Sequence, residues 1–166
     1  MKKMFDAIKY FTEMAEKNRL CQQKGFKAVV ISNTDNLEGL LEEYRENDRF
    51  IAITDTSTEN LSSDDGEYAF TKRRAFTVMI LSAYNYPDME DRQRQLELCR
   101  EVFKQFVTRI IRDKYTYDER MVQFETQSIP NAELGRYYLS GMTGLYFTLY
   151  TREPIDLVYN KEEWDG

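Results

Sequence analysis

Residues 89–115 carry the repeat that most restricts what this chain can fold into. Apolar side chains recur there at alternating steps of three and four residues, at Leu96, Cys99, Phe103, Phe106 and Ile110. Because an α-helix turns once every ~3.6 residues, this spacing aligns them in one stripe of a long amphipathic helix. Cys99 lies within the stripe, so we expect a buried, unreactive thiol.

The flanking segments are typical of strands and shorter helices. Helical spacing of apolar residues predicts helices over 3–23 and 33–48. β-branched and aromatic composition, or alternation, predicts strands over 26–32, 49–55, 67–86, 120–128, 134–153 and, at an edge of the sheet, 154–160. The run Val78–Leu81 is apolar at every position, which predicts a central strand covered on both faces. The glycines of "GMTG" (141–144) predict a turn or bulge.

The order of these elements defines the fold class. Strands and helices do not alternate regularly, and the sequence has no internal repeat and no Pro- or Ser-rich linker. We therefore predict a single domain over 1–166 with an α+β fold. We expect a largely antiparallel sheet of about four to six strands with two or three helices packed on one face.

Composition excludes several kinds of chemistry. The chain contains no histidine, which removes histidine-activated nucleophiles, histidine bases and nearly all catalytic zinc sites. Its two cysteines are far apart in sequence, so neither a disulfide framework nor a zinc ribbon is indicated. The net charge of −6 disfavours broad DNA binding. We expect no cofactor. We also expect no signal peptide and no membrane span, hence a protein of the cytoplasm.

Residues 54–74, "TDTSTENLSSDDGEYAFTKRR", concentrate opposite charges. The spacing of the acids fits neither a calcium-binding loop nor a metal nuclease, and its turn-forming residues predict a long polar hairpin loop leading into the central strand. Alternation places Lys72 and Arg74 on one face of that strand and Arg73 on the other. We expect the acids and bases of this loop to pair with one another or with a neighbouring subunit. The candidate contact residues are Asp55, Glu59, Asp64, Asp65, Glu67, Lys72, Arg73 and Arg74.

Two passages resemble a known group of proteins. "FTVMILSAYNYPDMEDRQRQLELCREVF" (76–103) and "LSGMTGLYFTLYTREPIDL" (139–157) are similar to the strand–loop–long-helix passage and the closing sheet of the tail-terminator, tail-completion and head–tail connector proteins of tailed bacteriophages. The resemblance covers most of the chain in order and length, and it is one of topology.

That resemblance implies a virion protein without catalysis, assembled in the host bacterial cytoplasm. It would form a homo-oligomeric ring, often a hexamer, at the head–tail junction or tail end. The loop over 54–74 would then reach a neighbouring subunit or the channel lumen. Its partners would be neighbouring neck or tail proteins, with DNA only passing through the channel and no membrane involved.

Two other readings stay open. One is a carboxylate-dependent metal nuclease or phosphate-handling enzyme that uses the acidic loop. The other is a small soluble adaptor that binds one partner through its aromatic closing strands. Candidate interface aromatics are Tyr137, Tyr138, Tyr146 and Tyr150.

Overall fold

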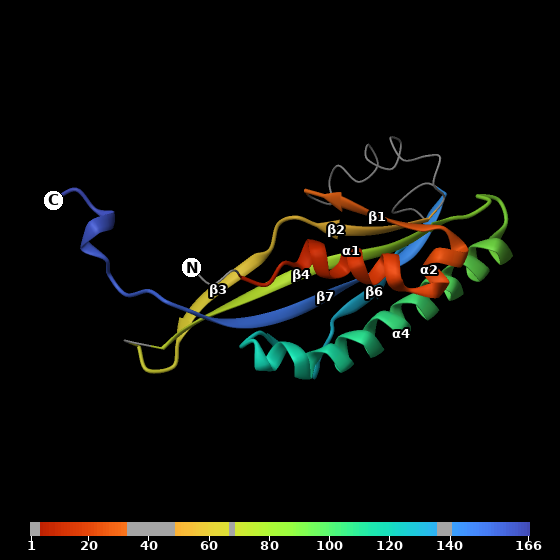
Figure 1. Cartoon of the computed structure of the whole chain (residues 1–166). Helices are drawn as coiled ribbons and strands as arrows, with labels where there is room; N and C mark the ends of the chain where they lie inside the picture. Colours follow the sequence, from red (N-terminus) through yellow and green to blue (C-terminus); the bar gives the residue numbers. More distant parts are fainter. Residues whose placement is uncertain (1–3, 33–48, 67–68, 136–140) are drawn as a thin grey trace.

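The computed structural model describes residues 4–32, 49–66, 69–135 and 141–166. In chain order its elements are α1 (Ala7–Lys17), α2 (Arg19–Lys24), β1 (Phe26–Ile31), β2 (Arg49–Thr54), β3 (Thr58–Ser63), β4 (Phe70–Ala83), α4 (Met89–Glu119), β5 (Gln123–Phe124), β6 (Asn131–Glu133), β7 (Met142–Ile155) and the 3₁₀ helix η1 (Lys161–Glu163). Figure 1 shows the strands forming one twisted sheet, with α1, α2 and α4 beside it. The helix predicted over 33–48 lies outside the described residues.

The strands form one sheet whose main path runs β1-β2-β4-β7-β5, with β3 also paired to β4 and β6 to β7. Only β1 and β2 are parallel among these pairs; the others are antiparallel. The predicted α+β class and largely antiparallel sheet are confirmed. The sheet has seven described strands, more than the expected number, because 58–63 forms a strand and two short strands follow α4.

β4 and β7 are the two longest strands and lie at the centre of the sheet. Each has 14 residues, and they pair without interruption from Phe70 opposite Ile155 to Ala83 opposite Met142. Gly144 lies within β7 at a φ of 150°, and a Cβ there would lie 1.9 Å from the carbonyl oxygen of Ile80. Gly144 therefore permits a close approach of the two central strands and makes no turn. The predicted turn is present at Gly141, which lies just before β7 at a φ of 74°.

The core has two layers, one on each face of the sheet. Ile51, Val78 and Ile80 pack in a large cluster with buried side chains of α1 and α4, whereas Met79 and Leu81 belong to a second cluster on the opposite face. This alternation follows from the two-residue period of a strand. The prediction that Val78–Leu81 forms a central strand buried on both faces is confirmed, since none of the four is more than 1% exposed.

The long helix predicted from the apolar stripe is present as α4 and extends to Glu119. Asp88 begins it, because its carboxylate accepts hydrogen bonds from the backbone N–H groups of Glu90 and Asp91. Cys99 is fully buried, and burial raises the pKa of its thiol to about 12, as expected for an inert cysteine. None of the described helices is long and apolar enough to cross a membrane.

Several boundaries differ from prediction. The strand predicted over 67–86 ends at Ala83, and the strand predicted over 134–153 begins at Met142. The helix predicted over 3–23 divides at Asn18, whose extended backbone ends α1 and whose side chain caps α2 through the N–H of Cys21. The strand predicted over 120–128 pairs only at Gln123–Phe124. The edge strand predicted over 154–160 does not form a separate strand: Pro154 and Ile155 are the last residues of β7, and 156–160 are not in a strand.

Candidate assembly surface

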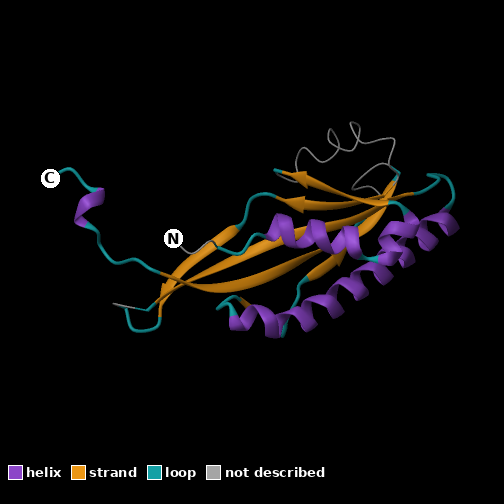
Figure 2. Cartoon of the chain, viewed as in Figure 1, coloured by secondary structure: helices purple, strands orange, loops and turns teal. Residues whose placement is uncertain are grey.

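Beyond α1 the sheet continues as a narrower extension in which β3, β4 and β7 lie side by side, and the two-residue strand β5 pairs with β7 at its base. We call it the arm and define it as β3, residues 70–75 of β4 and residues 150–155 of β7. β3 pairs with β4 from Thr58 opposite Ala75 to Ser63 opposite Phe70. Figure 2 shows these strands running past α1 and α4 to the turn that joins β3 to β4. β3 is exposed along nearly its whole length.

The tip of the arm is a short turn rather than the long polar loop predicted from the sequence. The Asp65 carboxylate accepts hydrogen bonds from the Ser63 hydroxyl (2.9 Å) and the Ala69 backbone N–H (3.3 Å). Gly66 has a φ of 77°, which favours glycine, and its N–H donates to Ser63. Residues read as loop therefore divide into a six-residue strand, β3, and this turn.

Glu59 joins β3 to β4 on the arm face that continues from α1. Its carboxylate pairs with the Lys72 ammonium at 2.6 Å and with the Arg74 guanidinium at 3.0 Å. The hydrogen bond from Lys72 is the largest cause that holds the pKa of Glu59 below its ordinary value. Lys72 and Arg74 thus share a face, as strand alternation predicts.

Arg73 lies on the opposite face of the arm. Its guanidinium forms a two-pronged contact with Glu125, whose carboxylate also accepts a hydrogen bond from Arg152 at 2.6 Å. The same guanidinium lies 4.0 Å from the centroid of the Tyr150 ring, a cation–π geometry. Two cations share one carboxylate here, so this cluster carries an excess of positive charge.

Arg74 and Glu153 hold the chain just before α1 against the arm. The Glu153 carboxylate, 5% exposed, accepts the Phe5 backbone N–H at 3.0 Å, and Arg74 donates to the Phe5 carbonyl oxygen at 2.9 Å. Arg74 and Glu153 lie 4.0 Å apart. The Phe5 ring packs edge-on against Phe76 with centroids 5.8 Å apart. We call these contacts of Arg74 and Glu153 with Phe5 the clamp. They explain why an acid, Glu153, is buried on the face of β7 that points toward the core.

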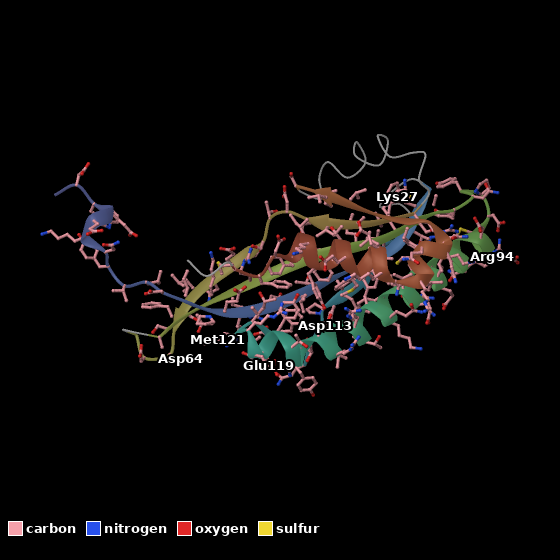
Figure 3. All side chains as sticks on the ribbon, in the orientation of Figure 1. Lys27, Asp64, Arg94, Asp113, Glu119 and Met121 are labelled. Atoms are coloured by element: carbon pink, nitrogen blue, oxygen red, sulfur yellow. The ribbon has the colours of Figure 1, made fainter. Side chains whose placement is uncertain are left out.

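The remaining predicted acids are dispersed. Asp55 follows β2 and accepts a hydrogen bond from the Ser32 hydroxyl at 3.0 Å. Asp64 lies at the tip, as Figure 3 shows. β3 separates the two, and six residues at ~3.3 Å per residue span about 20 Å. Within the described ranges, no group of three or more Cys, Asp or Glu residues is placed to hold a metal ion.

The predicted interface aromatics have mixed outcomes. Tyr146 is 39% exposed, and Tyr150 contacts Arg73 on the same face of the sheet. Tyr137, Tyr138 and the acid Glu67 lie outside the described residues.

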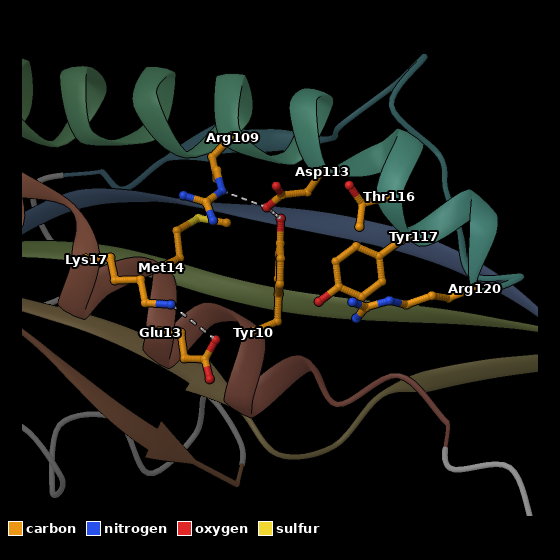
Figure 4. Close-up of a pocket in the computed structure, with 9 residues that line it drawn as sticks. All are labelled: Tyr10, Glu13, Met14, Lys17, Arg109, Asp113, Thr116, Tyr117 and Arg120. Atoms are coloured by element: carbon orange, nitrogen blue, oxygen red, sulfur yellow. Dashed lines mark hydrogen bonds and ion pairs between the residues drawn. The ribbon is translucent and has the colours of Figure 1, made fainter.

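A second cluster of polar side chains lines a small pocket between α1 and α4 (Figure 4). The Tyr10 hydroxyl donates to Asp113 at 3.0 Å, and Arg109 donates to the same carboxylate oxygen at 2.8 Å. Burial, followed by the charge of Asp113, raises the pKa of Tyr10 far above its ordinary value. A tyrosine held neutral in this way is a poor base or nucleophile and a good hydrogen-bond donor. The arrangement ties the two helices together.

Three partners of the predicted residues were missed from the sequence: Glu125, Arg152 and Glu153. A signal existed for Glu153, because it continues the two-residue row of Leu145, Phe147 and Leu149 that faces the core. No comparable signal marks Glu125, which follows the two-residue strand β5 and meets Arg73 only through tertiary structure.

The chain matches no model of a known protein family, and no curated protein sequence matches it.

Proposed function

We propose that this protein is a structural protein that assembles with further copies of itself through the arm, and that it catalyses no reaction. The projecting arm with its exposed strand carries the proposal. Among the described residues β3 pairs with β4 alone, so the other edge of β3 presents backbone groups to its surroundings. Leu61 at the middle of β3 is 50% exposed. A neighbouring subunit that covers the arm buries this edge and this apolar side chain.

We further propose a particular setting: a ring at the head–tail junction or tail end of a tailed bacteriophage, hence a virion protein. The resemblance described for 76–103 and 139–157 supports it, and these passages correspond to the β4–α4 connection and to β7. A net charge of −6 suits a channel that lets DNA pass without binding it. Neck or tail proteins of the particle would be its other partners.

The nuclease reading has less support from the geometry. The Glu59 carboxylate is engaged by Lys72 and Arg74, and the Asp65 carboxylate closes the turn. A nuclease would show Mg²⁺-dependent cleavage that Asp64→Ala with Asp65→Ala abolishes. No described contact favours the adaptor reading over self-assembly.

Light scattering coupled to gel filtration, followed by negative-stain microscopy, tests the proposal. We expect a discrete oligomer of several subunits with a ring-shaped image. Leu61→Arg places a charge on β3 and should release monomers. Ile111→Arg is the matched control, because Ile111 is 46% exposed on α4, away from the arm. A wild-type chain that stays monomeric across the concentration range refutes the proposal, and so does equal dissociation of both variants.

A further inference from the structure

Residues Asp156–Gly166, which we call the exposed segment, follow β7 beyond the tip of the arm. Every residue in it is exposed. Its large apolar side chains are unusually open to solvent, with Val158 83%, Tyr159 70% and Trp164 65% exposed. The rings of Tyr159 and Trp164 stack with centroids 6.4 Å apart. Tyrosine and tryptophan are the residues that most often anchor one protein on another.

The charge of the exposed segment is predominantly negative. It contains four acids against one lysine, at Asp156, Glu162, Glu163, Asp165 and Lys161. Figure 1 shows the segment leading away from the sheet, with the end of the chain separated from the rest of the molecule. An acidic segment with exposed aromatic rings is complementary to a basic surface with exposed arginines.

A surface of opposite charge lies on the arm face of Arg73. A pocket of about 560 Å³ opens there, and its charged lining is Arg73, Lys114 and Arg152 against a single acid, Glu125. Its volume falls within the range of roughly 300–1,000 Å³ in which proteins hold ligands. We call it the basic pocket. Tyr150 and the polar stretch 126–128 complete much of its wall.

The arginines of the basic pocket remain accessible although they pair with Glu125. The side chains of Arg73 and Arg152 are 40% and 50% exposed. An exposed guanidinium accepts an aromatic ring on its face and can still donate to a carboxylate at its edge. The basic pocket therefore offers partners both to the rings and to the acids of the exposed segment.

We propose that the exposed segment of one copy docks in the basic pocket of a second copy. Tyr159 and Trp164 would stack on the exposed arginines, and Glu162 and Glu163 would pair with the surplus positive charge. The occupant is a second copy because the segment complements this pocket in charge and leads away from its own. The inference rests on the proposed self-assembly and names the contact that links neighbouring subunits.

Photo-crosslinking between isotopically distinct copies tests this docking. Trp164 is replaced by benzoylphenylalanine in the full chain, and ¹⁴N- and ¹⁵N-labelled preparations are mixed, irradiated and analysed by mass spectrometry. We expect crosslinks that join one light and one heavy peptide, with the acceptor site among the residues that line the basic pocket, at 73, 114, 123–130 or 150–152. When the two preparations are unfolded in urea and refolded together, crosslinks confined to single-isotope pairs mean that the segment folds onto its own chain, and crosslinks to another surface place it elsewhere. Either result overturns the inference.

Charge reversal provides the second measurement. Arg152→Glu should abolish the crosslink, whereas Arg94→Glu, whose side chain is 62% exposed near the start of α4, should leave it unchanged. Combining Arg152→Glu with Glu162→Arg and Glu163→Arg should restore it. Equal loss in both single variants, with the fold intact by circular dichroism, overturns the inference.

The two proposals can fail separately. If the wild-type chain forms an oligomer by light scattering but the crosslink does not reach the basic pocket, docking fails and self-assembly stands. If the wild-type chain is monomeric, both fail. Where docking holds, Tyr159→Ala with Trp164→Ala should raise the dissociation constant of the oligomer about tenfold or more.

Discussion

Gly144→Ala is the most severe small change that the structure predicts. The added methyl group would lie 1.9 Å from the carbonyl oxygen of Ile80 and 3.1 Å from the Cα of Leu81, both backbone atoms of β4. A carbon and a carbonyl oxygen in close contact are normally about 3.3 Å apart. β7 would therefore have to move by more than an ångström from the strand with which it forms its longest ladder.

Two costs combine at this position. The φ of 150° is one that residues with a side chain rarely adopt, and holding a residue there costs about 1–3 kcal/mol. Forcing extra atoms into a packed interior costs about 1–3 kcal/mol more. The expected loss in the free energy of unfolding is therefore about 2–6 kcal/mol, a large share of the 5–15 kcal/mol that typical domains possess.

Urea unfolding followed by far-ultraviolet circular dichroism measures this loss. Fluorescence is a poor choice, because the single tryptophan, Trp164, is 65% exposed outside the sheet. Gly135→Ala is the matched control: it makes the same chemical change where an added Cβ meets nothing within 4 Å, and should alter stability by no more than about 0.5 kcal/mol. Equal midpoints for the two variants would show that the close approach of β4 and β7 at Gly144 is wrong.

Other changes test the clamp, the helix pocket, the thiols and the response to acid. Glu153→Gln weakens the buried clamp and should cost about 1–3 kcal/mol in the same urea titration; an unchanged midpoint would contradict it. Tyr10→Phe removes a hydrogen bond to a carboxylate and should cost about 1–2 kcal/mol, measured in the same way. Burial raises the pKa of Cys21 and Cys99 to about 12, so both should resist a thiol-specific disulfide reagent until denaturant is added, and rapid labelling of the native protein would refute this. A hydrogen bond from Arg73 lowers the pKa of Glu125 below its ordinary value of 4.5. The pairing of Glu125 with Arg73 therefore stabilises the fold above pH 4.5, and this stabilisation is lost as the pH falls through the lower pKa of the folded state. Below pH 4.5 the wild type should lose stability more steeply than Glu125→Gln, and parallel curves would argue against the pairing.

The parts of the fold that the sequence predicted are those with a strong local period. The three-and-four spacing of α4 and the apolar run of β4 each identify an element without reference to the rest of the chain. β3 was missed because Asn60, Ser62 and Ser63 favour turns by themselves. Its strand conformation depends on pairing with β4, which local composition does not encode.

The candidate site was less predictable than the fold. Alternation placed Arg73 opposite Lys72 and Arg74, and this is what the ion pairs show. The partners themselves are set by tertiary structure: Glu153 and Phe5, which form the clamp, are 148 residues apart in sequence.

The break between α1 and α2 at Asn18 was missed for a different reason. The apolar residues keep a helical spacing across it, and only the capping contact of the Asn18 side chain interrupts the helix.

The unbroken ladder of β4 and β7 has a mechanical consequence. β4 and β7 run from the arm through the core without a break, so we expect the arm to be rigid relative to the core. Slipping the register by one residue would turn every side chain of either strand to the wrong face, which the two core layers resist. A load applied near Asp64 at the tip would therefore be transmitted along 14 paired residues to Ala83 at the far end of the core. Any partner that grips the arm is thereby held at a fixed distance and angle from the body of the protein.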